Sequence, residues 1–147
     1  MKPNPRILIS DDSENLRKVI RRYLSSKFKD AVFFEAGDGE EAELHLQEQS
    51  IMGEPIDVVF LDWMMPGVTG FEFMVKIRGT ELFKSKPKII MLTAETYSEQ
   101  MNAAHKFDVT AYIIKPFEQH QLIEALEKAL AALESEAPES GGLKNAS

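Results

Sequence analysis

The stretch Ile7-Leu8-Ile9-Ser10-Asp11-Asp12 runs from three branched apolar residues straight into two adjacent carboxylates. A short apolar run that does not alternate with polar residues is typical of a strand covered on both faces of a sheet. Neighbouring carboxylates repel each other, so a folded chain rarely places them side by side without compensation. The stretch therefore predicts a buried strand that ends in an acidic site.

Outward from this stretch, strand-sized apolar runs alternate with segments of helical period. The runs are Val32 to Phe34, Val58 to Leu61, Ile89 to Leu92 and Tyr112 to Ile114. Apolar stripes at helical spacing occur at Leu16, Val19, Ile20, Tyr23 and Leu24, and again at Leu122, Ile123, Leu126, Leu130 and Leu133. Helices with a less distinct apolar stripe are expected from Gly39 to Gln49, Phe71 to Arg78 and Ser98 to Phe107. Such alternation predicts an α/β fold, a doubly wound five-stranded parallel sheet with five helices.

Composition excludes several classes of protein. The chain has 147 residues and is 44% hydrophobic, which suits one domain with a buried core. Its formal charge of −7 argues against direct binding of nucleic acid. The chain has no cysteine, which excludes disulfides and thiol chemistry. No apolar run approaches the roughly 20 residues that span a bilayer, so we expect no membrane insertion and a cytoplasmic location.

Residues whose side chains could bind a ligand or take part in a reaction follow four of the five predicted strands. In open parallel sheets, ligands bind outside the carboxyl ends of the strands. The residues at these ends are Asp11 and Asp12, Asp62, Thr93 and Lys115. Each alone has an ordinary explanation as a helix cap, a turn residue or a solvated charge. Independent caps and charges, however, have no reason to gather three carboxylates, a hydroxyl and an ammonium at one edge.

The chemistry of such a group points to a metal and to phosphorus. Three nearby carboxylates raise one another's pKa or recruit a cation, and hard oxygen ligands favour Mg²⁺, with Mn²⁺ as a substitute. A carboxylate beside a metal and an ammonium is a competent nucleophile toward a phosphoryl group, which makes Asp62 the candidate nucleophile. A structural alternative stays open for the first strand end, with Asp12 or Ser13 as a helix cap and Asp11 with Glu14 at capping-box spacing.

The sequence resembles the receiver domain of two-component response regulators from Arg6 to about Leu133. The resemblance is carried by residues 7–12, 58–67, 91–94 and 112–117, which read ILISDD, VVFLDWMMPG, MLTA and YIIKPF. It points to a single-domain member of the chemotaxis type and implies the flavodoxin-like strand order 2-1-3-4-5. It also divides the chain into a lead at 1–5, a receiver domain at 6–135 and a flexible tail at 136–147.

For the acidic residues the resemblance implies phosphoacceptance. Asp62 would accept a phosphoryl group from the phosphohistidine of a sensor histidine kinase or phosphotransfer protein. Asp12 and Asp62 would ligate Mg²⁺ together with the backbone carbonyl of Met64, and Asp11 would act mainly through bound water. The side chains of Met64 and Glu95, each two residues past a site residue, would modulate how long the phosphoryl group survives.

For the remaining strand ends the resemblance implies binding of the phosphoryl group and a switch. Lys115 would pair with Asp62 and then with the phosphoryl group, which Thr93 and Ala94 would also contact. Thr93 would turn its hydroxyl toward a phosphoryl oxygen, and Tyr112 would swing inward behind it. The resemblance also implies a cis peptide before Pro116, and an X-Pro bond lowers the cost of the cis form to about 1 kcal/mol or less.

The implied output is a contact with another protein. The switch would act through the fourth helix, fifth strand and fifth helix, either on a downstream target or in a phosphorelay. Only a short tail follows the last predicted helix, so no effector domain is expected. The protein would not be an enzyme acting on other substrates, because it would catalyse only its own phosphorylation and dephosphorylation.

Two other functions stay open, and one position departs from the family pattern. A receiver that is never phosphorylated would serve as an interaction scaffold. More remote is a Mg²⁺-dependent phosphatase with an aspartate nucleophile, which needs a second acid where this chain has Met64. Asp108 stands about where many receivers have glycine, which leaves the conformation before the fifth strand open.

Overall fold

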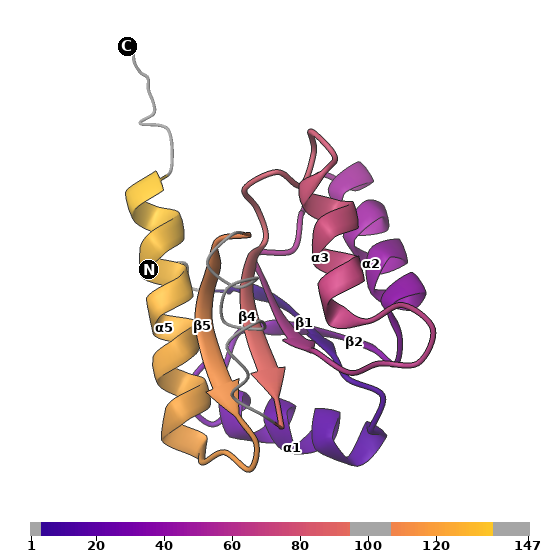
Figure 1. The fold of residues 1–147 in the computed structure, drawn as a ribbon. Coiled ribbons are helices and arrows are strands. Elements are labelled where there is room, and N and C mark those ends of the chain that lie inside the picture. The colour runs from indigo at the N-terminus through magenta and orange to yellow at the C-terminus, as the bar shows by residue number, and fades with distance from the viewer. Residues whose placement is uncertain (1–3, 95–106, 137–147) are drawn as a thin grey trace.

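The protein, seen in a computed structural model, is a sheet between two layers of helices (Figure 1). The structure describes residues 4–94 and 107–136. Its strands are β1 (Arg6–Ser10), β2 (Val32–Ala36), β3 (Val58–Asp62), β4 (Lys88–Thr93) and β5 (Val109–Ile114). Its helices are α1 (Glu14–Ser25), α2 (Gly39–Ile51), α3 (Gly70–Arg78) and α5 (Gln119–Glu136). The predicted helix at 98–107 lies outside the described residues except for Phe107, and so do Glu95 and the tail after Glu136.

The predicted sheet is confirmed. All five strands are parallel, and their order is β2-β1-β3-β4-β5. Four of the strands match the apolar runs to within two residues at each end. β5 begins three residues earlier than predicted, at Val109, and its pairing with β4 is irregular between Ile89 and Ile90.

Two cores explain why the central strands read as continuous apolar runs. Alternate residues point to opposite faces of the sheet, so Ile7 and Ile9 pack on one side and Leu8 on the other. α1 and α5 cover the first face, and α2 and α3 cover the second (Figure 1). Every residue of β3 and β4 is buried as a result.

The start of α1 resolves the alternative left open at the first strand end. Ser13 is the N-cap, and its hydroxyl accepts a hydrogen bond from the backbone N–H of Leu16 at 3.2 Å. The Asp11 Oδ1 atom accepts from the backbone N–H of Ser13 at 2.9 Å, which tightens the turn between β1 and α1. Ser13, and not Asp12, is therefore the helix cap, and the carboxylate of Asp12 is not needed for that role.

The amino ends of the strands hold a buried ammonium, at the opposite edge from the acidic residues. The side chain of Lys88 is only 3% exposed. Its Nζ donates to both carboxylate oxygens of Glu136, at 2.6 and 2.7 Å, and lies 3.8 Å from Asp108 Oδ2. The last residue of α5 therefore supplies the main countercharge for a cation inside the sheet.

The loop before β5 takes the conformation that glycine usually supplies. Asp108 has a φ of 58°, in the left-handed region. Aspartate tolerates this region better than most residues because its short polar side chain interacts locally. The question that the sequence left open at this position is settled in favour of a left-handed turn.

Candidate functional site

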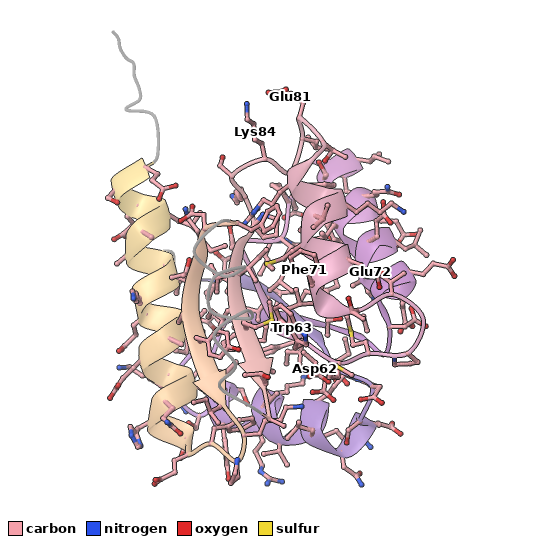
Figure 2. All side chains as sticks on the ribbon, in the orientation of Figure 1. Asp62, Trp63, Phe71, Glu72, Glu81 and Lys84 are labelled. Carbon is pink, nitrogen blue, oxygen red and sulfur yellow. The ribbon has the colours of Figure 1, made fainter. Side chains whose placement is uncertain are left out.

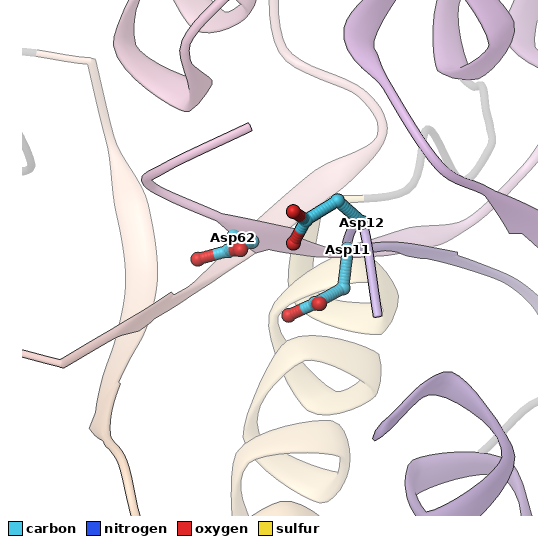
Figure 3. A group of neighbouring side chains, drawn as sticks. All are labelled: Asp11, Asp12 and Asp62. Carbon is cyan, nitrogen blue, oxygen red and sulfur yellow. The ribbon is translucent and has the colours of Figure 1, made fainter. Parts of the chain in front are cut away.

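The carboxyl ends of β1 and β3 bring together the three predicted acidic residues (Figure 3). One carboxylate oxygen from each of Asp11, Asp12 and Asp62 lies within 4.8 Å of the other two. Asp11 and Asp62 are 1% and 4% exposed, whereas Asp12 faces solvent. The group is thus sunk into the sheet edge and open on one side.

Lys115, just after β5, reaches across this edge to two of the carboxylates. Its Nζ donates to Asp11 Oδ2 at 2.9 Å and lies 3.3 Å from Asp62 Oδ1. Burial by itself lowers the pKa of Lys115, but the hydrogen bond and charge of Asp11, together with Asp62, raise it above its usual value. The ammonium is therefore firmly charged. Its peptide bond to Pro116 is cis, and its backbone N–H donates to the Thr93 carbonyl at 2.7 Å.

One ammonium does not balance three carboxylates. Burial and the charge of Asp11 raise the pKa of Asp62 from 3.8 to about 6. Lys115 and the backbone N–H of Met64, 3.3 Å from Asp62 Oδ1, act in the opposite direction without cancelling the rise. Such a cluster of oxygen donors with an excess of negative charge fits a hard divalent cation such as Mg²⁺.

The other predicted residues lie around this group. Thr93 is 2% exposed at the end of β4, and its side chain is hydrogen-bonded to Tyr112 of β5. Burial raises the pKa of the Tyr112 hydroxyl, and the bond to Thr93 partly offsets this rise. Ala94 follows Thr93 at the surface, and the side chain of Met64 is 67% exposed beside Asp62.

The response regulator receiver domain family matches residues 7–127. The chain belongs to this family. The resemblance found in the motifs is thereby confirmed, and receiver domains are signalling proteins.

Curated relatives of this receiver are chemotaxis proteins. Chemotaxis protein CheY-3 of Vibrio cholerae is 35% identical over 133 residues, which cover 88% of this chain and 95% of the relative. Chemotaxis protein CheY of Pseudomonas aeruginosa is 34% identical over 126 residues, which cover 84% and 94%. Both relatives match over nearly their whole length.

Solved structures agree on the fold. The chemotaxis protein CheY4 of Vibrio cholerae superimposes with a TM-score of 0.72 at 29% identity, covering 86% of this receiver and 98% of that chain. A CheY-like receiver domain protein of Methanospirillum hungatei gives a TM-score of 0.76 at 24% identity, covering 91% and 99%. Within the described part of the receiver, none of the helices is both long and apolar enough to cross a membrane.

Gly70, which was not predicted from the sequence, packs closely against the backbone of Asp62 and Trp63. The N–H of Gly70 donates to the Trp63 carbonyl at 2.8 Å, and the N–H of Trp63 donates to the Leu92 carbonyl at 2.9 Å. A Cβ at Gly70 would lie 2.9 Å from Trp63 Cα and closer still to the Asp62 carbonyl oxygen. Only glycine permits this approach. The ring of Trp63 packs on Phe71 at the start of α3, with 5.8 Å between centroids (Figure 2).

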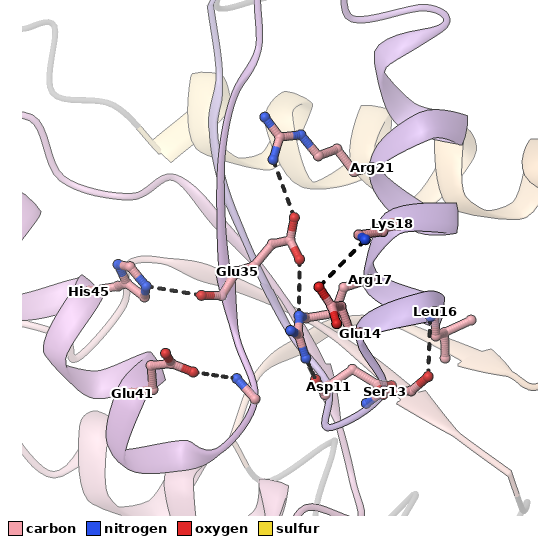
Figure 4. A network of polar contacts seen from close by, with 11 residues as sticks. Asp11, Ser13, Glu14, Leu16, Arg17, Lys18, Arg21, Glu35, Glu41 and His45 are labelled. Carbon is pink, nitrogen blue, oxygen red and sulfur yellow. Dashed lines mark hydrogen bonds and ion pairs between the residues drawn. The ribbon is translucent and has the colours of Figure 1, made fainter.

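Two further residues near the receiver's acidic pair were not predicted either. Arg17 of α1 donates to the Asp11 carbonyl at 2.6 Å and to Glu35 of β2 at 3.0 Å (Figure 4). The sequence shows both as ordinary charged residues, and β2 has no chemically distinctive residue at its end. Their connection depends on how α1 lies against the sheet, which no local pattern reveals.

Proposed function

We propose that the protein is a phosphoacceptor of two-component signalling, with Asp62 as the residue that receives the phosphoryl group. The observation that carries this proposal is that the buried Asp62 lies beside the carboxylates of Asp11 and Asp12 and within 3.3 Å of the ammonium of Lys115. A buried carboxylate with one cationic neighbour and two acidic ones is poorly explained as a structural ion pair. It is well suited to hold a cation and to attack an electrophile.

The acidic residues fit Mg²⁺ by the chemistry of their donors. Asp12 and Asp62 would hold the ion with the backbone carbonyl of Met64, and Asp11 would act mainly through water. When bound, the ion supplies positive charge that neutralises the carboxylates and the oxygens of a phosphoryl group. The open side at Asp12 leaves room for retained water and for the donor.

In the proposed transfer, a carboxylate oxygen of Asp62 forms a bond to phosphorus while the phosphorus–nitrogen bond of the donor's phosphohistidine breaks. The imidazole leaves with the electron pair of that bond. Asp62 must be ionised to attack, and a pKa of about 6 leaves it ionised at neutral pH. Lys115 stays within reach of the phosphoryl oxygens through its position between Asp11 and Asp62. Removal of the group by water would return the protein to its starting state.

The proposed switch uses the bond between Thr93 and Tyr112. A phosphoryl group on Asp62 offers acceptor oxygens to the Thr93 hydroxyl and to the N–H of Ala94. When the Thr93 hydroxyl turns toward the phosphoryl group, its bond with Tyr112 is exchanged for a new one. The tyrosine ring on β5 then responds to the state of Asp62, which would alter the surface of β5, α5 and the segment before them for a downstream protein.

A surface for the donor protein lies next to the site. A mostly apolar groove of about 390 Å³ opens between α1 and the loop that joins β5 to α5. It is lined by Leu16, Val19, Tyr23, Lys115, Pro116 and Phe117. Because Lys115 belongs to both the groove and the site, a protein seated there would bring a histidine close to Asp62.

The test is the intact mass of the protein after incubation with Mg²⁺ and a small acyl-phosphate donor. We expect the gain of one phosphoryl group, lost in EDTA and in Asp62→Asn. Asp30→Asn, which removes an exposed carboxylate before β2, is the control and should be phosphorylated like the native protein.

A folded protein that gains no phosphoryl group from the small donor should next be offered a phosphorylated histidine kinase. Failure with both donors would contradict the proposal. It would favour a receiver that acts as an interaction scaffold without phosphorylation.

A further inference from the structure

The peptide group that joins Asp11 to Asp12 is held by β2 through a side chain of α1 (Figure 4). Arg17 Nη1 donates to the Asp11 carbonyl at 2.6 Å, and Arg17 Nε donates to Glu35 Oε1 at 3.0 Å. The side chains of Arg17 and Glu35 are only 15% and 24% exposed. The planar guanidinium thus spans from the edge strand to the acidic turn with two hydrogen bonds.

Glu35 is itself fixed from two directions. Its second carboxylate oxygen lies 3.2 Å from Arg21 Nη1, one turn further along α1. Its carbonyl oxygen lies 3.0 Å from His45 Nε2 of α2. The carboxylate that accepts from Arg17 therefore has a second cationic partner, and the backbone of the same residue is contacted by α2.

The backbone of Asp11 is consequently secured at both of its polar groups. Its N–H donates to the Ala36 carbonyl at 3.0 Å, and its carbonyl accepts from Arg17. Because the peptide unit is planar, the orientation of this carbonyl sets the directions in which the side chains of Asp11 and Asp12 leave the backbone. A rotation of this one peptide would move both carboxylates relative to Asp62.

We infer that Arg17, braced by Glu35, is a positioning residue that holds the Asp11–Asp12 peptide in the orientation required for binding a divalent cation. The inference rests on the proposed function, since it concerns the same cation site. It adds to that site a dependence on α1 and β2, two elements whose side chains contribute no ligand to it.

An electrostatic role and a positioning role of Arg17 predict opposite changes in Mg²⁺ affinity when this residue is replaced. A guanidinium close to the site repels a dication, so if only its charge mattered, its removal would tighten binding of Mg²⁺. If Arg17 positions the acidic pair, its removal weakens binding. Loss of a group that orients a metal ligand typically costs on the order of 10- to 100-fold in affinity. The sign of the change therefore separates the two roles.

The experiment is a titration with Mg²⁺ alone, followed by the fluorescence of Trp63, which is the single tryptophan and adjoins Asp62. We expect Arg17→Gln to weaken binding of Mg²⁺ about 10-fold. Arg17→Lys should recover part of the loss, because an ammonium reaches one acceptor but lacks the fork that spans both. Arg22→Gln is the matched control. Arg22 is an exposed residue in the last turn of α1, so its replacement removes the same charge from the same helix without touching the β1–α1 turn or Glu35, and the affinity should stay close to that of the native protein.

Thermal unfolding in EDTA shows whether each variant is folded before its affinity is measured. If Arg17→Gln does not fold, Glu35→Gln takes its place, since it keeps an acceptor oxygen and should weaken Mg²⁺ binding to a smaller degree. Equal or tighter binding of Mg²⁺ by a folded Arg17 variant would overturn the positioning role. Failure of the native protein to bind Mg²⁺ would instead overturn the proposed function, and this inference with it.

Discussion

Replacing Asp62 with asparagine should stabilise the metal-free protein at neutral pH. Burial and the neighbouring charge of Asp11 raise the pKa of Asp62 from 3.8 to about 6, so the folded protein bears a cost for ionising this group. Each pKa unit is worth about 1.4 kcal/mol, and the rise of about two units corresponds to about 3 kcal/mol. The side chain is 5% exposed, so solvent screens little of this cost. Asparagine keeps the size and removes the charge, and we expect a gain of roughly 1–3 kcal/mol in the free energy of unfolding.

The gain has a defined dependence on pH. The pKa of Asp62 is higher in the folded protein than in the unfolded chain, so the folded state binds the proton more tightly. The stability that this proton provides is fully present below about pH 4 and is lost as the pH rises through 6. The advantage of Asp62→Asn should therefore be small at pH 4, grow between pH 4 and 6, and level off above 7.

Urea unfolding in EDTA, followed by circular dichroism at several pH values, measures this advantage. A second buried aspartate serves as the control. Asp57 precedes β3, its side chain is 2% exposed, and it pairs with Lys86 Nζ at 3.2 Å and the Arg6 N–H at 2.8 Å. Asp57→Asn should lower the free energy of unfolding, because it weakens a satisfied pair instead of relieving a repulsion.

Addition of Mg²⁺ should narrow the gap between the native protein and Asp62→Asn. At a hundred times its Kd, an ion that binds only the folded state adds about 2.7 kcal/mol to stability. An Asp62→Asn protein that is no more stable than the native one at pH 8 in EDTA would refute the reasoning. So would an advantage that does not change between pH 4 and 8.

Three other substitutions test the support around the site and the far edge of the sheet. Gly70→Ala should lower the free energy of unfolding by roughly 1–3 kcal/mol and weaken Mg²⁺ binding, because its Cβ meets the Asp62–Trp63 backbone; denaturation and a metal titration check both effects. Glu136→Gln should cost roughly 1–3 kcal/mol in urea unfolding, because the buried Lys88 ammonium keeps only Asp108, at 3.8 Å, as a close charged partner among the described residues. Asp108→Gly should be more stable than Asp108→Ala by about 1 kcal/mol, since both lose the carboxylate but only alanine is strained at a φ of 58°; equal melting temperatures would contradict this.

The central strands could be predicted because a strand that is buried on both faces consists of consecutive apolar residues. β3 and β4 are buried at every residue, and their runs of branched apolar side chains match the strands to within two residues at each end. β5 was predicted to start too late because it lies at the sheet edge, where Val109 to Tyr112 are only partly buried and Thr110 interrupts the apolar run. The order of the strands was predicted from the family resemblance, because the spacing of apolar residues does not indicate which strands are neighbours in the sheet.

The acidic site was predictable for a topological reason. Parallel strands end at the same edge of a sheet, so residues that follow separate strands converge there however far apart they lie in the chain. The structure brings Lys115 to within 2.9 Å of Asp11 across 104 residues of sequence. This rule identifies the residues that follow the strands at that edge. It does not identify the residues that hold them in place, such as Gly70, Arg17 and Glu35.

Local patterns in the chain sufficed for the alternation of elements, the burial of the central strands and the identity of the residues at the strand ends. They sufficed because apolar period and residue type are properties of short segments. Three other features depend on the tertiary structure alone. They are the hydrogen bonds by which Arg17 links Glu35 to the Asp11–Asp12 peptide, the need for glycine at position 70 and the raised pKa of Asp62. Each of these arises from groups on different elements brought within a few ångströms, where bond geometry, steric contact and unscreened charge depend on distances that no short segment contains.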